Sequence, residues 1–154
     1  AIYKPSQDLV YFYSVKRKAT FISLKNTMKK IITTPNAPAP IGPYNQAVLS
    51  GNTLYISGQT PIDPRTGNLV SGSIEEETLQ VMKNIEAILI AAGATFESVV
   101  KASIFVKDMH QFKAINDVYA QFFKPETAPA RETIEVANLP MFVNVEISMI
   151  ANIE

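Results

Sequence analysis

The chain of 154 residues contains no cysteine, no tryptophan and a single histidine, His110. The missing cysteines exclude a disulfide scaffold, a thiolate metal site and a cysteine nucleophile. One histidine cannot form a histidine-rich metal site or a two-histidine acid–base pair. No apolar run approaches the roughly 18 residues that a membrane helix needs. We therefore expect neither a metal centre nor a membrane segment.

The remaining composition is that of one folded domain. Apolar residues make up 47% of the chain and charged residues 18%, which is enough apolar material for a packed core and too little charge for a disordered chain. The 14 basic and 14 acidic residues balance. This balance argues against the uniformly basic surface of a non-specific nucleic-acid binder.

The charges are unevenly distributed along the chain. Residues 1–27 hold five basic residues against Asp8 alone, whereas residues 28–154 hold nine basic and thirteen acidic residues. We therefore divide the chain into an N-terminal extension, residues 1–27, and a domain, residues 28–154. The extension is interpreted as a transit peptide, as an upstream-translated or vector-derived segment, or as extra strands. We expect a cytoplasmic protein, or a mitochondrial or plastid-type one if the extension is a transit peptide.

The pattern of residues 28–154 predicts two helices. Ser73 and Glu76 have capping-box spacing at the start of the first helix, and Gly93 is its natural end. Asp108 and Gln111 repeat this spacing before a second helix that ends before Pro125. Apolar alternation and turn residues predict five strands: Gln46–Leu49, Thr53–Ser57, Val99–Val106, Arg131–Val136 and Val143–Ile150. The order ββαβαββ predicts an α+β two-layer sandwich with both helices on one face of a mixed sheet.

The uncovered face of such a sheet is expected to be polar or buried in an oligomer. Strand alternation assigns Ser57, Arg131, Thr133 and Glu146 to this face. If the last two strands pair, Arg131 and Glu146 lie near one pocket. A guanidinium matches a carboxylate in bidentate fashion, so the pattern is typical of a small-molecule site at a subunit interface. The alternative is an ordinary cross-strand ion pair on a solvated face.

Each of the other candidate site residues has a functional and a structural interpretation. Ser57 and Gly58 supply a hydroxyl and an unobstructed backbone amide, or simply end a strand. Tyr44 lies over a pocket or packs in the core. Asn116 is a helix-surface amide or a hydrogen-bonding group facing a loop. His110, without a partner histidine or cysteine, is expected at the surface.

Several motifs together resemble the Rid family of reactive-intermediate deaminases. They occur in the family's order and cover residues 28–152, leaving residues 1–27 outside. The N-terminal motifs are Asn36-Ala37-Pro38-Ala39-Pro40-Ile41-Gly42-Pro43-Tyr44 and Ile56-Ser57-Gly58-Gln59-Thr60-Pro61. The later motifs are Val99-Val100-Lys101-Ala102, Phe105-Val106-Lys107-Asp108-Met109, Pro129-Ala130-Arg131, Ile134-Glu135-Val136-Ala137, Leu139-Pro140 and Val145-Glu146-Ile147.

This resemblance implies a chorismate-mutase-like fold assembled as a homotrimer with pockets between subunits. It implies hydrolysis of 2-imino or 2-enamino acids, such as 2-aminoacrylate, to 2-keto acids and ammonia without a cofactor. Carried over by position, Arg131 would hold the substrate carboxylate, and Glu146 would position and activate the attacking water. Further pocket residues would be Tyr44, Ser57, Gly58, Asn116 and Thr133.

Two residues depart from the family pattern. Thr133 stands where many deaminating members have cysteine, but threonine keeps a small hydrogen-bonding group. Glu132 stands where a small residue is usual, and alternation directs its side chain away from the face of Arg131. A ribonuclease or translation inhibitor and a non-catalytic ligand-binding or chaperone-like trimer are the alternative functions. One histidine and the acidic domain argue against a nucleic-acid partner.

Overall fold

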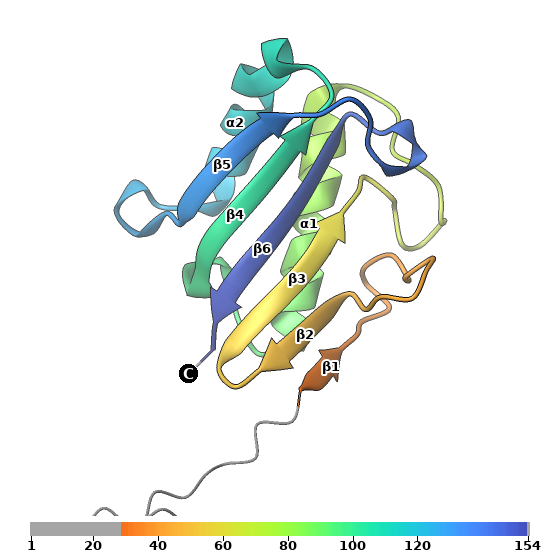
Figure 1. Ribbon diagram of the computed structural model, residues 1–154. Coiled ribbons are helices and arrows are strands. Elements are labelled where there is room, and N and C mark those ends of the chain that lie inside the picture. The colour runs from red at the N-terminus through yellow and green to blue at the C-terminus, as the bar shows by residue number, and fades with distance from the viewer. Residues whose placement is uncertain (1–28, 154) are drawn as a thin grey trace, which may run out of the picture.

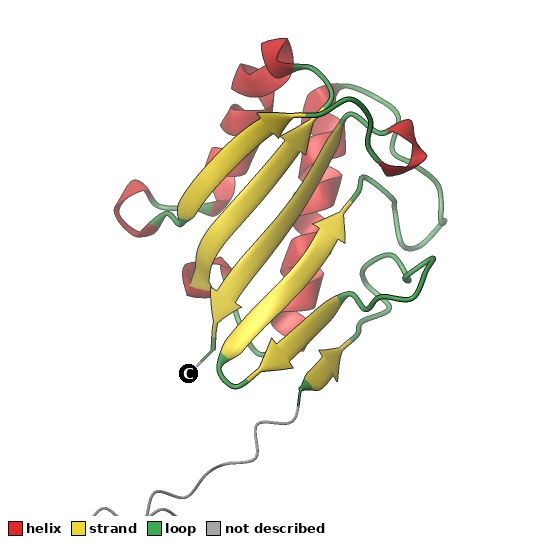
Figure 2. Ribbon diagram, viewed as in Figure 1, coloured by secondary structure: helices red, strands yellow, loops and turns green. Residues whose placement is uncertain are grey.

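A computed structural model describes residues 29–153, which form one six-stranded sheet with two helices (Figure 1). Both helices lie on the same face of the sheet and leave the other face uncovered (Figure 2). This is the two-layer α+β arrangement that the sequence predicts. The helices are α1, Ile74–Ala91, and α2, Phe112–Tyr119; the strands are β1, Lys30–Ile32, β2, Ala47–Ser50, β3, Thr53–Gln59, β4, Val99–Val106, β5, Ala130–Glu135, and β6, Val145–Asn152.

The first helix has the predicted ends. The Ser73 side chain accepts a hydrogen bond from the Glu76 amide, and the Glu76 carboxylate accepts one from the Ser73 amide. Gly93 follows the helix with a φ of 78°, the left-handed conformation that glycine adopts without a steric penalty. These caps fix the helix at both ends, so its apolar face is placed firmly on the sheet.

The second helix starts differently from the prediction. The Asp108 side chain caps a 3-10 turn, Met109–Gln111, by accepting a hydrogen bond from the His110 amide. Gln111 makes no side-chain capping bond to α2. The predicted capping box is therefore wrong here, because the Asp108 carboxylate closes a tighter local turn before the helix begins. His110 lies at the surface, as expected, with its ring against Asp108.

The strand order is β1-β2-β3-β6-β4-β5. The hairpin of β2 and β3 agrees with the sequence interpretation, whereas β1 was not predicted. The pairing of the last two strands, which the sequence left as a condition, is not found: β6 lies between β3 and β4, and among the described strands β5 pairs only with β4. The reason is that β4, α2 and β5 form a crossover unit, which places β5 parallel to β4 at the sheet edge.

The register assigns the site candidates to opposite faces. Arg131 pairs with buried Ala102 and Thr133 with buried Ile104, and directly paired residues share a face. Arg131 and Thr133 therefore lie on the helix-covered side, which corrects their predicted position on the uncovered face. Alternation from buried Val145 and Ile147 directs Glu146 to the uncovered face. Between the sheet and the helices lies the apolar core, which includes Leu54, Ile56, Val81, Ile85, Ile88 and Ile147.

Among residues 29–153, no helix combines the length and the hydropathy that a bilayer crossing requires. The interpretations given to residues 1–27 lie outside the described residues.

Candidate active site

A pocket of about 410 Å³ opens beside the ends of β3 and β6. This volume lies in the range of small-molecule sites, roughly 300–1,000 Å³. Its walls come from the proline-rich loop before β2, from the end of β3 with the loop after it, from the turn before β6, and from Glu146. Four predicted site residues line it together: Tyr44, Ser57, Gly58 and Glu146.

Glu146 supplies the only carboxylate among the residues lining this pocket. Its side chain is half-buried, and burial raises the pKa of the carboxyl above its ordinary value. Among the described residues, no basic side chain forms an ion pair with it. A carboxylate held without a cation is a better proton acceptor than an ion-paired one.

Gly58 makes room for this carboxylate. A Cβ atom at this position would lie 1.8 Å from Oε1 of Glu146 and 2.7 Å from its Cδ. A larger residue at position 58 would therefore force the end of the Glu146 side chain to move away from the backbone of β3. The register of β3 and β6 also shifts here, between Ile56 and Gln59, so the sheet is locally irregular where the pocket opens.

Ser57 precedes this irregularity, and its hydroxyl has a fixed direction. Its Oγ donates a hydrogen bond to the carbonyl oxygen of Asn45 at 2.7 Å. Its backbone amide donates to the carbonyl oxygen of Gln46 at 3.0 Å. The hydroxyl proton is thus directed away from a ligand, and the oxygen lone pairs of Ser57 are the part available to one.

The proline-rich wall is held in place by Gln46, which sequence reasoning did not select. Its side chain is 3% exposed. Nε2 donates to the carbonyl oxygens of Thr34, Ala37 and Pro38, and Oε1 accepts from the Thr34 amide at 2.7 Å. Prolines leave a loop short of amide donors, so one buried amide side chain after a proline cluster is the signal that could have identified it.

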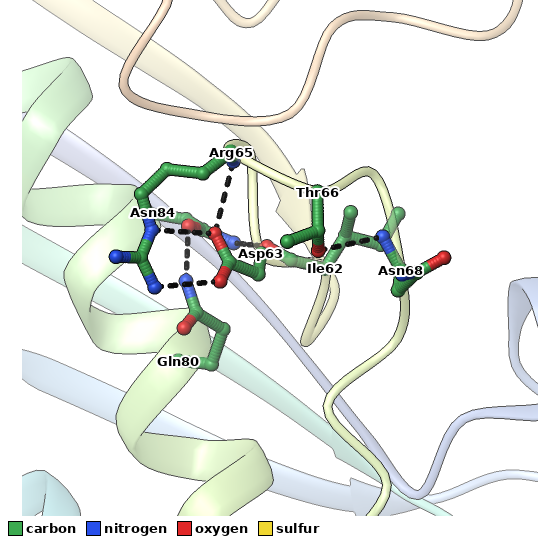
Figure 3. A network of polar contacts seen from close by, with 7 residues as sticks. All are labelled: Ile62, Asp63, Arg65, Thr66, Asn68, Gln80 and Asn84. Carbon is green, nitrogen blue, oxygen red and sulfur yellow. Dashed lines mark hydrogen bonds and ion pairs between the residues drawn. The ribbon is translucent and has the colours of Figure 1, made fainter.

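The wall after β3 is anchored to α1. Nδ2 of Asn84 donates to the carbonyl oxygens of Thr60, at 3.1 Å, and Ile62, at 2.9 Å. Gln80, one turn earlier on the helix, donates to Oδ1 of Asn84 at 2.9 Å. Figure 3 shows Gln80 and Asn84 on the helix, the contact of Asn84 with Ile62, and the polar contacts of the turn that follows Ile62. Thr60 and Ile62 both line the pocket, so α1 sets the position of that wall.

Large apolar side chains form the rim of the pocket. Ile41 is 78% exposed and Met141 45% exposed, and both line the pocket. Met141 and the following Phe142 each have a φ of 57°. A non-glycine residue in this left-handed region stores strain of about 1–3 kcal/mol, and such strain is concentrated at functional sites. The tight turn after Pro140 thus keeps Met141 beside the pocket despite its backbone cost.

The other predicted site residues form a second group around α2 and β5. Nη1 of Arg131 donates to Oδ1 of Asn116 at 2.8 Å. The Arg131 guanidinium carbon also lies 4.9 Å from the ring centre of Tyr119 and 5.7 Å from that of Phe112. Thr133 lies two residues further on the same strand face, and its buried hydroxyl oxygen has no hydrogen-bond partner in the described part of the chain.

The two groups do not meet within one chain. Glu146 and Arg131 lie on opposite faces of the sheet, and β4 separates their strands. The condition under which Arg131 and Glu146 would lie near one pocket, pairing of their two strands, is therefore not met within one protomer. Glu132 behaves as alternation predicts: its carboxylate contacts Lys101 and Ser103 on the uncovered face rather than Arg131. We name the groups the carboxylate half-site (Tyr44, Ser57, Gly58, Glu146) and the guanidinium half-site (Asn116, Arg131, Thr133).

Metal ligands do not gather in this architecture. Within residues 29–153, no group of three or more histidine, cysteine, aspartate or glutamate side chains is arranged to hold a metal ion. The side chains that the pocket offers are a carboxylate, hydroxyls, amides and apolar groups, which suit the orientation of a small polar molecule with an apolar part.

Comparisons with known proteins place the chain in a family. Residues 34–153 match the profile of the family described as endoribonuclease L-PSP. The chain is 52% identical to a RutC family protein of Pyrococcus horikoshii over 124 residues, covering 80% of this chain and 98% of the relative. It is 48% identical to 2-iminobutanoate/2-iminopropanoate deaminase of Capra hircus over 128 residues, covering 83% of this chain and 93% of that protein.

A solved structure agrees with these relatives. The structure of a Rid family protein from Yersinia pestis matches with a TM-score of 0.80 and 48% identity. The match covers 82% of this chain and 100% of the Yersinia protein. The sequence resemblance to Rid proteins is thereby confirmed. The chain belongs to the Rid family, whose matching profile carries the description endoribonuclease L-PSP.

Proposed function

We propose that this protein is a hydrolytic deaminase that converts 2-imino and 2-enamino acids to 2-keto acids and ammonia. The observation that carries the proposal is the half-buried Glu146 carboxylate, which lies in a small pocket beside Gly58. No basic side chain of the described residues forms an ion pair with this carboxylate. The caprine relative, named 2-iminobutanoate/2-iminopropanoate deaminase, supports the same reaction.

The reaction asks little of the protein beyond orientation and proton transfer. An enamine first tautomerises to the imine, whose carbon is electrophilic. The oxygen of a water molecule bonds to this carbon while Glu146 accepts one proton from the water and the imine nitrogen takes a proton from the solvent. Glu146 then returns its proton to the nitrogen of the carbinolamine. The carbon–nitrogen bond breaks, ammonia leaves, and the hydroxyl group of the carbinolamine releases its proton to the solvent as the carbonyl of the 2-keto acid forms.

Arg131 is the proposed anchor for the substrate carboxylate. Its guanidinium has five N–H donors, of which one contacts Asn116. Among the ion pairs of residues 29–153, none involves Arg131. An exposed guanidinium without a carboxylate partner is suited to a bidentate contact with a ligand.

Because the half-sites lie on opposite faces of the sheet, one chain cannot supply both to the same substrate. We propose that the protein acts as a homotrimer in which Arg131, Asn116 and Thr133 of one copy face the Glu146 pocket of the next. A cyclic assembly repeats such a head-to-tail contact and closes on itself. Exposed apolar residues on the uncovered sheet face, Tyr55 and Ile134, are consistent with burial between copies.

The apolar rim favours substrates with an apolar side chain. Ile41 and Met141 face a ligand with hydrocarbon and thioether groups, and burial of one methylene contributes about 0.8 kcal/mol. We expect imines derived from aliphatic amino acids to be better substrates than the imine of aspartate, whose second carboxylate would have to enter an apolar environment beside Glu146.

Ribonuclease activity and bare ligand binding remain the alternative functions. RNA cleavage usually requires paired acid–base groups and cationic contacts with phosphate. His110 is exposed and is not among the residues that line the pocket, so the ribonuclease alternative has little support. A protein that only binds ligands would not require a carboxylate poised to accept a proton.

The proposal is tested by generating 2-aminoacrylate with a serine dehydratase and following its semicarbazone with and without this protein. We expect the protein to accelerate imine loss, and Arg131→Ala and Glu146→Gln to remove the effect. The imines of alanine, leucine and aspartate, formed by amino-acid oxidases, then test whether the apolar rim of the pocket favours aliphatic substrates. No acceleration with any imine contradicts the proposed reaction. RNA cleavage that persists after rigorous purification and is lost in Glu146→Gln supports the ribonuclease instead.

A further inference from the structure

The guanidinium of Arg131 is surrounded by one face of a single helix. Phe112, Asn116 and Tyr119 are separated by four and three residues on α2, a spacing that places side chains on one helix face. Asn116 accepts a hydrogen bond from Nη1 at 2.8 Å. The two aromatic rings contact the guanidinium carbon at 4.9 and 5.7 Å from their centres, within the roughly 6 Å of a cation–π contact.

Arg131 has few other restraints. It is exposed on β5, the strand at the edge of the sheet, and an exposed arginine side chain has many rotamers. The two rings contact the guanidinium carbon, and among the described residues only Asn116 accepts a hydrogen bond from the group. The aromatic contacts thus restrain the position of the group while its remaining donors stay available to a carboxylate.

We infer that Phe112 and Tyr119 are positioning residues for the carboxylate anchor: their rings fix the Arg131 guanidinium in the orientation that receives the substrate carboxylate. The inference rests on the proposed function, in which Arg131 holds that carboxylate. It goes further, because it assigns a substrate-binding consequence to two aromatic residues outside the half-sites defined above.

The ring of Tyr119, rather than its hydroxyl, carries this role. The hydroxyl is buried and has no hydrogen-bond partner in the part of the chain that the structure describes. Burial raises the pKa of Tyr119 to about 12, so the phenol stays neutral over the range in which enzymes are assayed. Removal of the hydroxyl should therefore be tolerated, and removal of the ring should not.

The test compares ring-keeping with ring-removing substitutions. Tyr119→Leu and Phe112→Leu should raise KM for the imine of alanine on the order of tenfold with kcat nearly unchanged, since loss of a cation–π contact weakens substrate binding uniformly. Tyr119→Phe and Phe112→Tyr should keep the wild-type KM. Phe112 is 38% exposed, so Phe112→Leu remains informative if Tyr119→Leu does not fold.

A readout independent of turnover separates this inference from the proposed function. Ring currents should displace the NMR resonance of the Arg131 Nε–H, and Tyr119→Leu should reduce the displacement whereas Tyr119→Phe keeps it. Absence of the displacement overturns the positioning role even if the deaminase reaction is real. A folded leucine variant with wild-type KM overturns it as well. If wild-type protein has no deaminase activity, weaker binding of 2-oxobutanoate by both leucine variants supports the positioning role, and unchanged binding overturns it.

Discussion

At the scale of single residues, the close approach of Gly58 to Glu146 determines the orientation of the proposed proton acceptor. The carboxylate is half-buried, and its flat end occupies the space where any other residue at position 58 would carry a Cβ atom. The orientation of the proposed proton acceptor is therefore set by the absence of a side chain on the neighbouring strand.

Gly58→Ala should displace the Glu146 carboxylate, because the new methyl group would lie 1.8 Å from Oε1. We expect kcat/KM to fall on the order of a hundredfold, the cost of a misplaced catalytic group. Stability should change little, since the far end of a flexible side chain can move. Gly42→Ala is the matched control, because its Cβ would lie 3.5 Å from the Tyr44 ring, an ordinary contact. Steady-state kinetics on both variants check this, and a fully active Gly58→Ala would contradict the assignment.

The raised pKa of Glu146 gives the pH profile a direction. The base must be ionised to accept a proton from water, and burial raises the pH at which it ionises. Activity should therefore fall, as pH is lowered, at a higher pH than an exposed glutamate would give. The profile of kcat/KM against pH measures this acid limb. Glu146→Asp, which keeps a carboxyl group, should retain an acid limb in any activity that it shows, whereas activity with an unchanged limb in Glu146→Gln would assign the ionisation to another group.

At the scale of elements, α1 determines where one wall of the pocket lies. Asn84 joins the helix to the carbonyl oxygens of Thr60 and Ile62. Because α1 is also capped at Ser73 and packed on the sheet, it transmits the rigidity of the core to the loop. The pocket is thus built by loops, but their positions are set by one helix.

Asn84→Ala should leave the carbonyl of Ile62 without its donor and remove one of the two donors to the carbonyl of Thr60, which keeps the Ile62 amide, and so loosen this loop. We expect a loss of about 1–3 kcal/mol of unfolding free energy, the cost of unpaired buried polar groups, together with a higher KM. Denaturant unfolding and kinetics measure the two effects. Lys83→Ala is the neighbouring control, since Lys83 is exposed. Equal stability and KM of Asn84→Ala and wild type would show that the loop is held by other contacts.

The elements themselves could largely be predicted from the sequence, and their pairing could not. Local signals were sufficient for α1, for β4 and for the turn at Gly51, because capping and alternation act between near neighbours in the chain. The position of β6 between β3 and β4 depends on contacts across the whole sheet. The sheet face of Arg131 was predicted wrongly for the same reason. Alternation divides the residues of a strand between two faces, but only the register with Ala102 shows that the face of Arg131 is the one covered by the helices. Gln46 and Asn84 were missed because their partners are backbone groups.

At the scale of the whole molecule, the carboxylate half-site and the guanidinium half-site of one chain are separated by the sheet. Arg131 lies on the helix-covered face of the edge strand, and Glu146 lies on the uncovered face of an inner strand. If both act on one substrate, they must come from different copies of the chain. Assembly is then a condition of activity, and dilution to monomers should abolish it.

Complementation between inactive variants shows whether the two half-sites that act on one substrate come from different copies of the chain. Differently tagged Arg131→Ala and Glu146→Gln proteins are unfolded together, refolded, and purified through both tags, so that mixed assemblies are isolated. Each variant alone should be inactive. In mixed assemblies an intact Arg131 of one copy can face an intact Glu146 of the next, and in a cyclic trimer that contains both variants this happens at about one third of the sites. We predict deaminase activity near that fraction of the wild-type level. Wild-type protein taken through the same treatment is the control and should regain its activity. Inactive mixed assemblies beside an active control would contradict the prediction.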